Sequence, residues 1–310
     1  MKINQRIWKT AALAAAITIV GSMFVMRLGD WSKGLNSEFI VYGDTGTSGT
    51  GGGSGTTIGG NITKIIPHMV AGGGYRTFVE VINTGATTAN VTAAFYVPAK
   101  NADGTSNPGG SGSLSTETFT TDLSGKTGTF SGSMSAVALA ASQILVIALE
   151  KSDPNISVNW GQIQSNGPVT VAAAFELRDG NKNLVSRVGV GASAADIKQF
   201  VIPRIRHVGR GLDIGYAIVN TGSNVATITA TLRDASGQNV LATKSLTLGP
   251  MNQIAIFTRE FFGGALTESD SGDKVAFQSL TFASVQGQFS ALALAIEGGQ
   301  LASFPVDRLQ

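Results

Sequence analysis

The chain has 310 residues, with 43% hydrophobic and 14% charged residues, 40 glycines and no cysteine. This apolar content excludes wholesale disorder, and the lack of cysteine excludes disulfides, thiolate metal sites and cysteine nucleophiles. The net charge is +2, but residues 1–33 alone carry +4 and the remainder −2. A nearly neutral remainder predicts no binding to nucleic acid.

The N-terminal segment, residues 1–33, has the pattern of an export signal. Three basic residues precede an uncharged run that covers positions 10–26, and a basic start before an apolar run is typical of exported proteins. The run is long for a signal peptide and at the short limit of a membrane span. We therefore expect either a cleaved signal peptide or a retained N-terminal anchor helix. Both place the protein at the cell surface or outside the cell, with membrane contact only through this segment.

Residues 34–61 are predicted to form a flexible linker rich in Gly, Ser and Thr. Nearly half of positions 44–60 are glycine, a composition that behaves as a flexible coil. A Gly-rich loop also occurs at phosphate sites. Here no Lys-Ser/Thr pair follows the glycines, so we interpret the segment as a tether.

The rest of the chain contains an internal repeat. An Ile-Pro pair occurs at 66–67 and again at 202–203, and Asn-Thr-Gly occurs at 83–85 and again at 220–222. The offset between the copies changes by only one position from the first motif to the second. A self-similar block of this size predicts tandem domains. We place them at residues 62–190 and 200–310, with 191–199 as connector.

Within each copy, apolar residues alternate with polar or small ones, which predicts strands with one buried face. Six to eight short strands per copy are expected from the spacing of the turns, the pattern of a β-sandwich. Equivalent strands are expected at 139–149 and 253–258, at 161–165 and 276–282, and at 169–177 and 288–296. The predicted fold class is all-β, with two tandem Ig-like sandwiches after the signal or anchor helix and the linker.

The first copy carries a long insertion at residues 100–133. Val97 aligns with Asp234, and further along the chain Gln143 aligns with Gln253. The stretch between these aligned positions is much longer in the first copy, and the excess falls at 100–133. Residues 116–121 and 126–131 are expected to form an added hairpin. A loop of this length is commonly functional or disordered, so a binding or assembly role and plain surface decoration both stay open.

Several motifs resemble a known class of module. The segments beginning Val81-Ile82-Asn83-Thr84-Gly85 and Ile218-Val219-Asn220-Thr221-Gly222 resemble bacterial Ig-like or fibronectin-III-like adhesion repeats of the CARDB type. Residues 246–254 resemble the start of a strand in those modules, with Met251-Asn252 where Gly is usual. The resemblance implies Ig-like β-sandwiches of an exported surface protein, and it bears on fold more than on function.

The candidate catalytic and metal-binding residues are few. The two histidines, His68 and His207, follow the Ile-Pro pair of each copy, which favours a shared structural role over a catalytic triad. The oxygen donors of 101–107 and of 270–273 suit either Ca²⁺ or ordinary turns. We assign no catalytic, cofactor or metal residue, and expect no cofactor.

Two further groups are candidates for binding. Arg204, Arg206 and Arg210 form the densest basic cluster of the chain, and Arg204 and Arg206 share one face of a strand. They are candidate contacts for a polyanion, with a charged edge strand as the alternative. Trp160 and Tyr75 suit a sugar platform or a buried core. Four glutamates, at positions 80, 150, 176 and 297, show no cleft pairing of the kind that glycoside hydrolysis needs.

These observations predict a non-enzymatic, exported bacterial surface protein with a structural, adhesive or assembly role. The expected partners are other proteins or further copies of the same chain at the cell surface, bound through loops or by strand addition. The alternative is a carbohydrate-binding surface module, with polysaccharide as its partner. An enzyme is the least favoured interpretation.

Overall fold

The computed structural model describes residues 62–194, 196–206, 212–263, 276–297, 300–304 and 306–309. Over these residues the protein is all-β, as predicted, with four antiparallel sheets. The leader 1–33 and the linker 34–61 lie outside the described residues. One short helix is described, α2 (Thr258–Phe262).

Two sheets come from the first copy. One contains β1 (Ile62–Ala71), β9 (Ser157–Ser165) and β3 (Ala89–Val97), and β3 also pairs with β4 (Ser113–Leu114) and β7 (Ser133–Leu139). The other follows the order β11 (Leu184–Gly191), β10 (Val169–Arg178), β2 (Tyr75–Asn83), β8 (Ile144–Glu150), β5 (Thr118–Leu123) and β6 (Lys126–Ser131). Their facing apolar residues form one core, which includes Val79, Phe95, Ile147 and Phe175.

The other two sheets come from the second copy. One follows the order β15 (Val240–Leu248), β14 (Ala226–Arg233), β17 (Ala276–Ala283), β12 (Gln199–Arg206) and β20 (Asp307–Arg308). The other follows β16 (Gln253–Phe257), β13 (Asp213–Asn220), β18 (Phe289–Glu297) and β19 (Gln300–Phe304). A second core lies between them and includes Ile202, Tyr216, Leu232 and Phe282.

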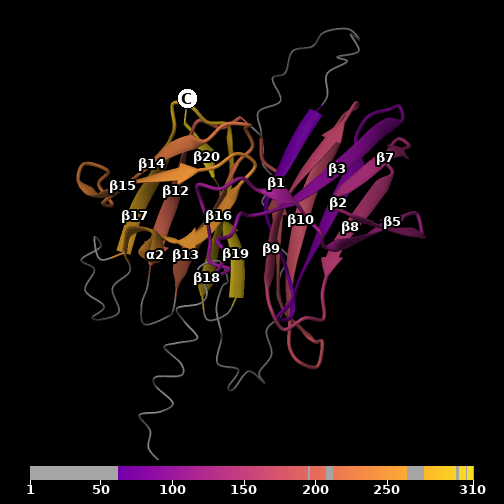
Figure 1. Ribbon diagram of the computed structural model, residues 1–310, viewed down its shortest axis with the longest axis horizontal. Helices are drawn as coiled ribbons and strands as arrows, with labels where there is room; N and C mark the ends of the chain where they lie inside the picture. Colours follow the sequence, from indigo (N-terminus) through magenta and orange to yellow (C-terminus); the bar gives the residue numbers. More distant parts are fainter. Residues whose placement is uncertain are drawn as a thin grey trace, which may run out of the picture.

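The internal repeat appears in the pairing of the strands. In the first copy the sheets run β1-β9-β3-β7 and β11-β10-β2-β8; in the second, the strands at equivalent positions run β12-β17-β14-β15 and β19-β18-β13-β16. The strand equivalences expected at 139–149, 161–165 and 169–177 are therefore confirmed. We call residues 62–191 the first half and 199–309 the second half. Figure 1 shows the magenta strands of the first half beside the orange and yellow strands of the second.

The strand order differs from that of immunoglobulin domains. In those domains the first two strands are neighbours in one sheet, whereas here β2 crosses to the opposite sheet and β1 pairs with β9. The fold shares the sandwich-like architecture of the Ig-like modules without their strand order. The resemblance to CARDB-type repeats therefore stays a prediction.

The Asn-Thr-Gly motif fixes the same turn in both halves. Asn83 is fully buried; its Nδ2 donates to the carbonyls of Thr87 and Leu139, and its Oδ1 accepts from Gly85 N. Asn220 repeats this arrangement with Asn224, Leu248 and Gly222. A buried amide that satisfies three backbone groups determines where the chain turns. The motif is therefore structural in both halves.

The insertion at residues 100–133 is built into the fold. The expected hairpin is confirmed as β5 and β6, with β5 also pairing with β8 so that the sheet of the first half widens. Phe119 of β5 is fully buried and stacks on Phe95 with ring centroids 4.3 Å apart. The insertion therefore contributes to the core of the first half.

The correspondence between the halves shifts by one position after the insertion. Asn83 N donates to the Gln143 carbonyl, and Asn220 N donates to the Asn252 carbonyl. Gln143 is thus equivalent to Asn252, and not to Gln253 as the sequence alignment predicted. Both turns also have one residue in the left-handed region, Ser142 (φ 61°) in the first half and Met251 (φ 51°) in the second. The sequence alignment did not pair these two residues with each other.

Candidate functional site

The two halves meet at a buried junction, which is the most elaborate feature of the described residues. Ile65 and Trp160 of the first half and Val219 of the second form a separate apolar cluster, with Tyr96 and Met251 packed against it. Tyr96 stacks on Trp160 at 4.4 Å between ring centroids. Strand β1 also contacts β13 and β18, and β11 contacts β19. The junction therefore extends along several strands of both halves.

Asn252 is the central polar residue of the junction. Its side chain is fully buried, and its Oδ1 accepts from Ala99 N at 2.9 Å and from Gln253 N at 2.8 Å. Its Nδ2 donates to the carbonyls of Asn107, Pro108 and Gly110, at 2.9–3.0 Å. One side chain thus binds Ala99, which precedes the insertion, and residues 107–110 within it.

We call residues 99–112 the strap, because this segment of the first half lies against the turn 249–252 of the second. Gly249 N donates to Pro108 O, and Gly112 N donates to Pro250 O. The backbones approach so closely that a Cβ on Gly112 would overlap the Met251 carbonyl. A Cβ on Gly249 would likewise overlap the Gly110 carbonyl. In Figure 1 a purple segment lies among the strands of the second half, beside β16.

His68 lies in the same junction and is 4% exposed. Its Nδ1 is 3.2 Å from Nε2 of Gln253, and the same Nε2 donates to Pro67 O at 2.5 Å. Burial lowers the pKa of His68 from 6.5 to about 4. Among the described residues, no hydroxyl nucleophile is bonded to the ring, and its setting fits the predicted structural role. His207 lies outside the described residues.

The predicted basic cluster is only partly described. Arg204 is 1% exposed, and its Nη1 donates to the side-chain oxygen of Gln278. Phe200, Ile202 and Arg204 are alternate residues of β12, so their side chains share one face of the strand, and all three are buried. The expectation of an accessible Arg204 is therefore wrong. Nothing is described of the Arg206 side chain or of Arg210, so a polyanion contact there stays a prediction.

A different basic cluster, which sequence reasoning missed, lies on the outer face of the first half. Glu176 of β10 is fully buried there and binds the side chains of Arg76, Arg178 and Arg187. Arg76 Nη1 also lies 3.6 Å from Glu150 Oε2. Residues 187, 176, 76 and 150 are direct cross-strand partners on β11, β10, β2 and β8. We call this row of alternating charges the charge ladder. It cannot be recognised in the sequence until the register of the four strands is known.

The two aromatic residues expected at a sugar platform or a core are both inside. Trp160 is fully buried and Tyr75 is 7% exposed. Burial also raises the pKa of Tyr75. Of the two predicted alternatives, the buried core is confirmed.

The oxygen donors of 101–107 are used within the strap. Asp103 Oδ1 accepts from the backbone N–H and the hydroxyl of Thr105, and these bonds lower the pKa of Asp103. Asn107 Oδ1 accepts from Gly110 N. Residues 270–273 lie outside the described ranges. Within those ranges, His, Asp and Glu side chains form no group of three that would hold a metal ion.

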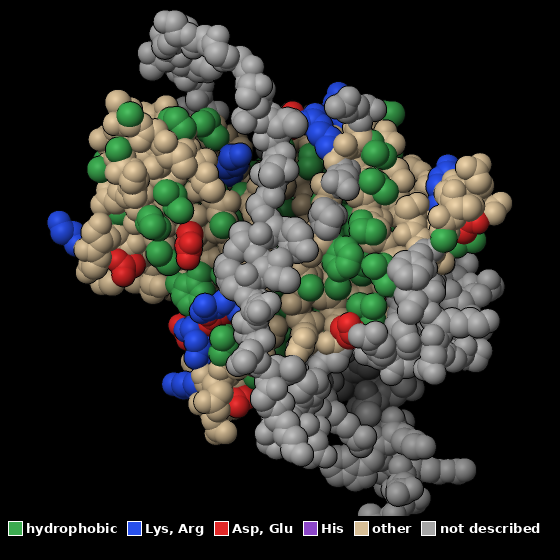
Figure 2. Space-filling model, turned by 180° about the vertical axis from the view of Figure 1, so that it is seen from behind, with side chains coloured by type: hydrophobic (Ala, Val, Ile, Leu, Met, Phe, Trp, Pro, Cys, Tyr) green, Lys and Arg blue, Asp and Glu red, His purple; other side chains and the backbone are tan. Residues whose placement is uncertain are grey.

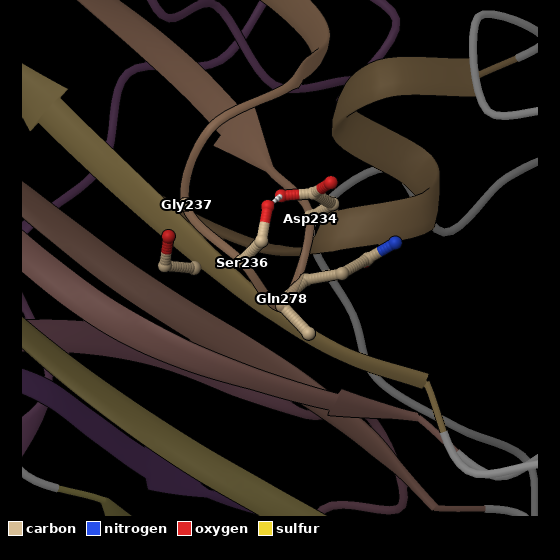
Figure 3. Close-up of a pocket in the computed structure, with 6 residues that line it drawn as sticks. Asp234, Ser236, Gly237 and Gln278 are labelled. Atoms are coloured by element: carbon tan, nitrogen blue, oxygen red, sulfur yellow. Dashed lines mark hydrogen bonds between the residues drawn. The ribbon is translucent and has the colours of Figure 1, made fainter.

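A shallow depression of about 260 Å³ lies at the turn between β14 and β15. Figure 3 shows Asp234 and Ser236 joined by a hydrogen bond, with Gln278 of β17 beside them. Hydrogen bonds from Ser236 and Asn239 lower the pKa of Asp234 to about 2. The carboxylate of Asp234 closes the turn, so the depression offers no acid–base pair among the described residues.

The described surface carries little charge. Figure 2 shows mostly uncharged side chains and backbone on one face, with basic and acidic groups in small clusters. Among the described residues, no helix has the length and apolar character needed to cross a membrane.

Comparison with protein-family models, with curated proteins and with solved structures finds no match to this chain.

Proposed function

We propose that the chain is a non-enzymatic, exported bacterial surface protein with a structural, adhesive or assembly role. It would consist of two tandem β-sandwich domains, residues 62–190 and 200–310, joined by 191–199. The observation that carries the proposal is the junction between the halves. A strap held by buried hydrogen bonds and an apolar cluster would fix the two sandwiches relative to each other, as a scaffolding protein at the cell surface requires.

The N-terminal sequence supports the cellular part of the proposal. Residues 1–33 would export the chain or anchor it, and residues 34–61 would hold the sandwiches at a distance from the membrane. The resemblance to CARDB-type adhesion repeats points to the same surface setting. The partners would be other proteins or further copies of the chain.

The placement of the reactive side chains supports a role without catalysis. His68 is packed in the junction, Glu176 is neutralised by three arginines, and Asp234 closes a turn. Each of these groups is already bound in a way that stabilises the fold. A catalytic acid or base needs a free position against substrate.

Fractionation of the producing organism tests the proposal. We expect the protein in the surface or culture fraction, accessible to protease added to intact cells, with an N-terminus that is either processed or retained in the membrane. A soluble cytosolic protein that begins with Met1 would overturn it. Retention on polysaccharide affinity gels, together with an unchanged cell surface after deletion of the gene, would favour the carbohydrate-binding alternative instead.

A further inference from the structure

Two edge strands of the sheets, β6 and β15, are left open by the described part of the chain. Strand β6 has β5 as its hydrogen-bonded neighbour, and β15 has β14. The described residues place no second partner strand on either. An edge strand presents unpaired N–H and C=O groups, which bind another strand wherever the sequence does not prevent it. In Figure 1, β15 lies in the left-hand half, and β5, the neighbour of β6, lies at the right-hand end.

Both edges have few of the features that usually protect such strands, namely one lysine on each strand and, on β15, a bulge at Leu241 near the start of the strand. On β15, Thr243, Ser245 and Thr247 are exposed and uncharged, whereas Ala242 and Leu246 pack on the core. The lysine of β15, Lys244, donates to the Phe261 carbonyl and lies 5.2 Å from the centroid of its ring. This contact holds the ammonium group on the inner face of β15, away from the row of Thr and Ser side chains. No proline interrupts the strand.

Strand β6 has the same alternation. Thr127, Thr129 and Ser131 are exposed, whereas Phe130 faces the core and stacks on Phe119 at 5.3 Å between ring centroids. Its one charged residue, Lys126, stands at the first position of the strand. Both edges thus present an outer row of Thr and Ser, the residue types that pair well across strands.

We propose that β15 of one copy pairs antiparallel with β6 of a second copy, so that the chain assembles head to tail. The pairing places Thr127 opposite Thr247, Thr129 opposite Ser245, and Ser131 opposite Thr243. The two edges belong to opposite halves, so every copy keeps one free edge of each kind. A contact between unlike surfaces builds rings or open filaments.

Like-with-like pairing of β15 is disfavoured by its sequence. In full register, a symmetric antiparallel pair of β15 strands places the central residue opposite itself, and the centre of β15 is Lys244. Like charges directly opposite each other destabilise a sheet. Pairing with β6 avoids this, because Lys244 then lies opposite Phe130. The inference rests on the proposed assembly role and names its partner as a second copy of the chain.

Disulfide cross-linking tests the pairing directly, because the chain has no cysteine of its own. The full chain is purified in a mild detergent that keeps residues 10–26 in solution, and is then oxidised. We expect the double variant Thr129→Cys/Ser245→Cys to give a ladder of dimers, trimers and larger species on a non-reducing gel. The matched control is Thr170→Cys/Ser245→Cys, because Thr170 is exposed on the central strand β10. It should stay monomeric.

The single variants distinguish head-to-tail from symmetric pairing. Thr129→Cys alone and Ser245→Cys alone should remain monomers, whereas their equimolar mixture should give dimers and nothing larger. Dimers of Ser245→Cys alone would overturn the proposal in favour of symmetric pairing. Cross-linking no greater than in the Thr170 control would show that the edges do not pair. Either result leaves the surface location untouched, so failure of this inference is separable from failure of the proposed function.

Discussion

Gln253 and His68, residues 185 positions apart, meet side chain to side chain across the junction, with Nε2 of Gln253 3.2 Å from Nδ1 of His68. Gln253 begins β16 in the second half, and His68 lies in β1 of the first. The contact joins buried polar side chains of the two halves inside the junction. The stability of the two halves should therefore be coupled, and it should depend on pH.

The burial of His68 predicts destabilisation in mild acid. Its pKa is about 4 in the folded protein and 6.5 unfolded, so the unfolded chain binds a proton first as the pH falls. Stability is then highest above pH 6.5, decreases as the pH falls to about 4, and loses about 3 kcal/mol in total. Urea unfolding between pH 7 and 5 measures the slope. His68→Gln should flatten it, whereas the control Thr170→Gln, at an exposed position of β10, should retain it; an unchanged slope in His68→Gln contradicts the assignment.

Removing Asn252 should uncouple the halves. Asn252→Ala deletes five hydrogen bonds, which removes the side-chain acceptor of Ala99 N–H and the side-chain donor to the Gly110 carbonyl. We expect a loss of roughly 2–4 kcal/mol and a single unfolding transition that separates into two. Calorimetry and denaturant unfolding monitor both effects. Asn181→Ala, at an exposed turn where the residue is bonded through its backbone N–H, is the control and should retain a single transition near the original temperature.

Mutation of the buried carboxylate of the charge ladder should lower the free energy of unfolding much more than mutation of the exposed one. Glu176→Gln leaves three arginines without their shared anion, and breaking a buried ion pair costs about 3–5 kcal/mol. Glu150→Gln removes an exposed carboxylate, where about 0–1 kcal/mol is expected. Equal losses of unfolding free energy in the two variants would refute a special role for Glu176.

The two Asn-Thr-Gly turns should respond alike to mutation. Asn83→Ala and Asn220→Ala each leave buried backbone carbonyls without a donor, for a loss of roughly 2 kcal/mol apiece in the free energy of unfolding, measured by urea titration. Asn224→Ala is the control, because Asn224 contributes only its backbone carbonyl to the turn. If only one half weakened, the structural equivalence of the motif would fail.

Much of the fold follows from local patterns in the sequence. Alternation predicts β2, β3, β10 and the hairpin of β5 and β6, and the repeated Ile-Pro and Asn-Thr-Gly motifs match their copies. Strand β11 was missed because its buried positions, Ser186, Val188 and Val190, include a polar residue and only two large apolar ones. Local patterns are weak where a strand is half polar.

The junction and the charge ladder could not be predicted in the same way. Asn252 looks like an ordinary turn residue until the strap, which lies far earlier in the chain, is placed against it. Glu176 resembles an isolated acid in the sequence, because its arginines come from three strands whose register is a tertiary property. Arg204 could have been assigned correctly, since Phe200 and Ile202 already indicate which face of β12 is buried.

The strap makes the two copies unequal partners. The first half supplies the strap, and the second half supplies the turn 249–252 that binds it. The residue of the first half equivalent to Asn252 is Gln143, and its side chain donates instead to Ser124 of the same half. A third unit made by duplicating the second half would contain a turn like 249–252, but the unit before it would have no strap to bind that turn. The contact between the halves is thus specific to one ordered pair, so duplication of the second half alone would not reproduce it.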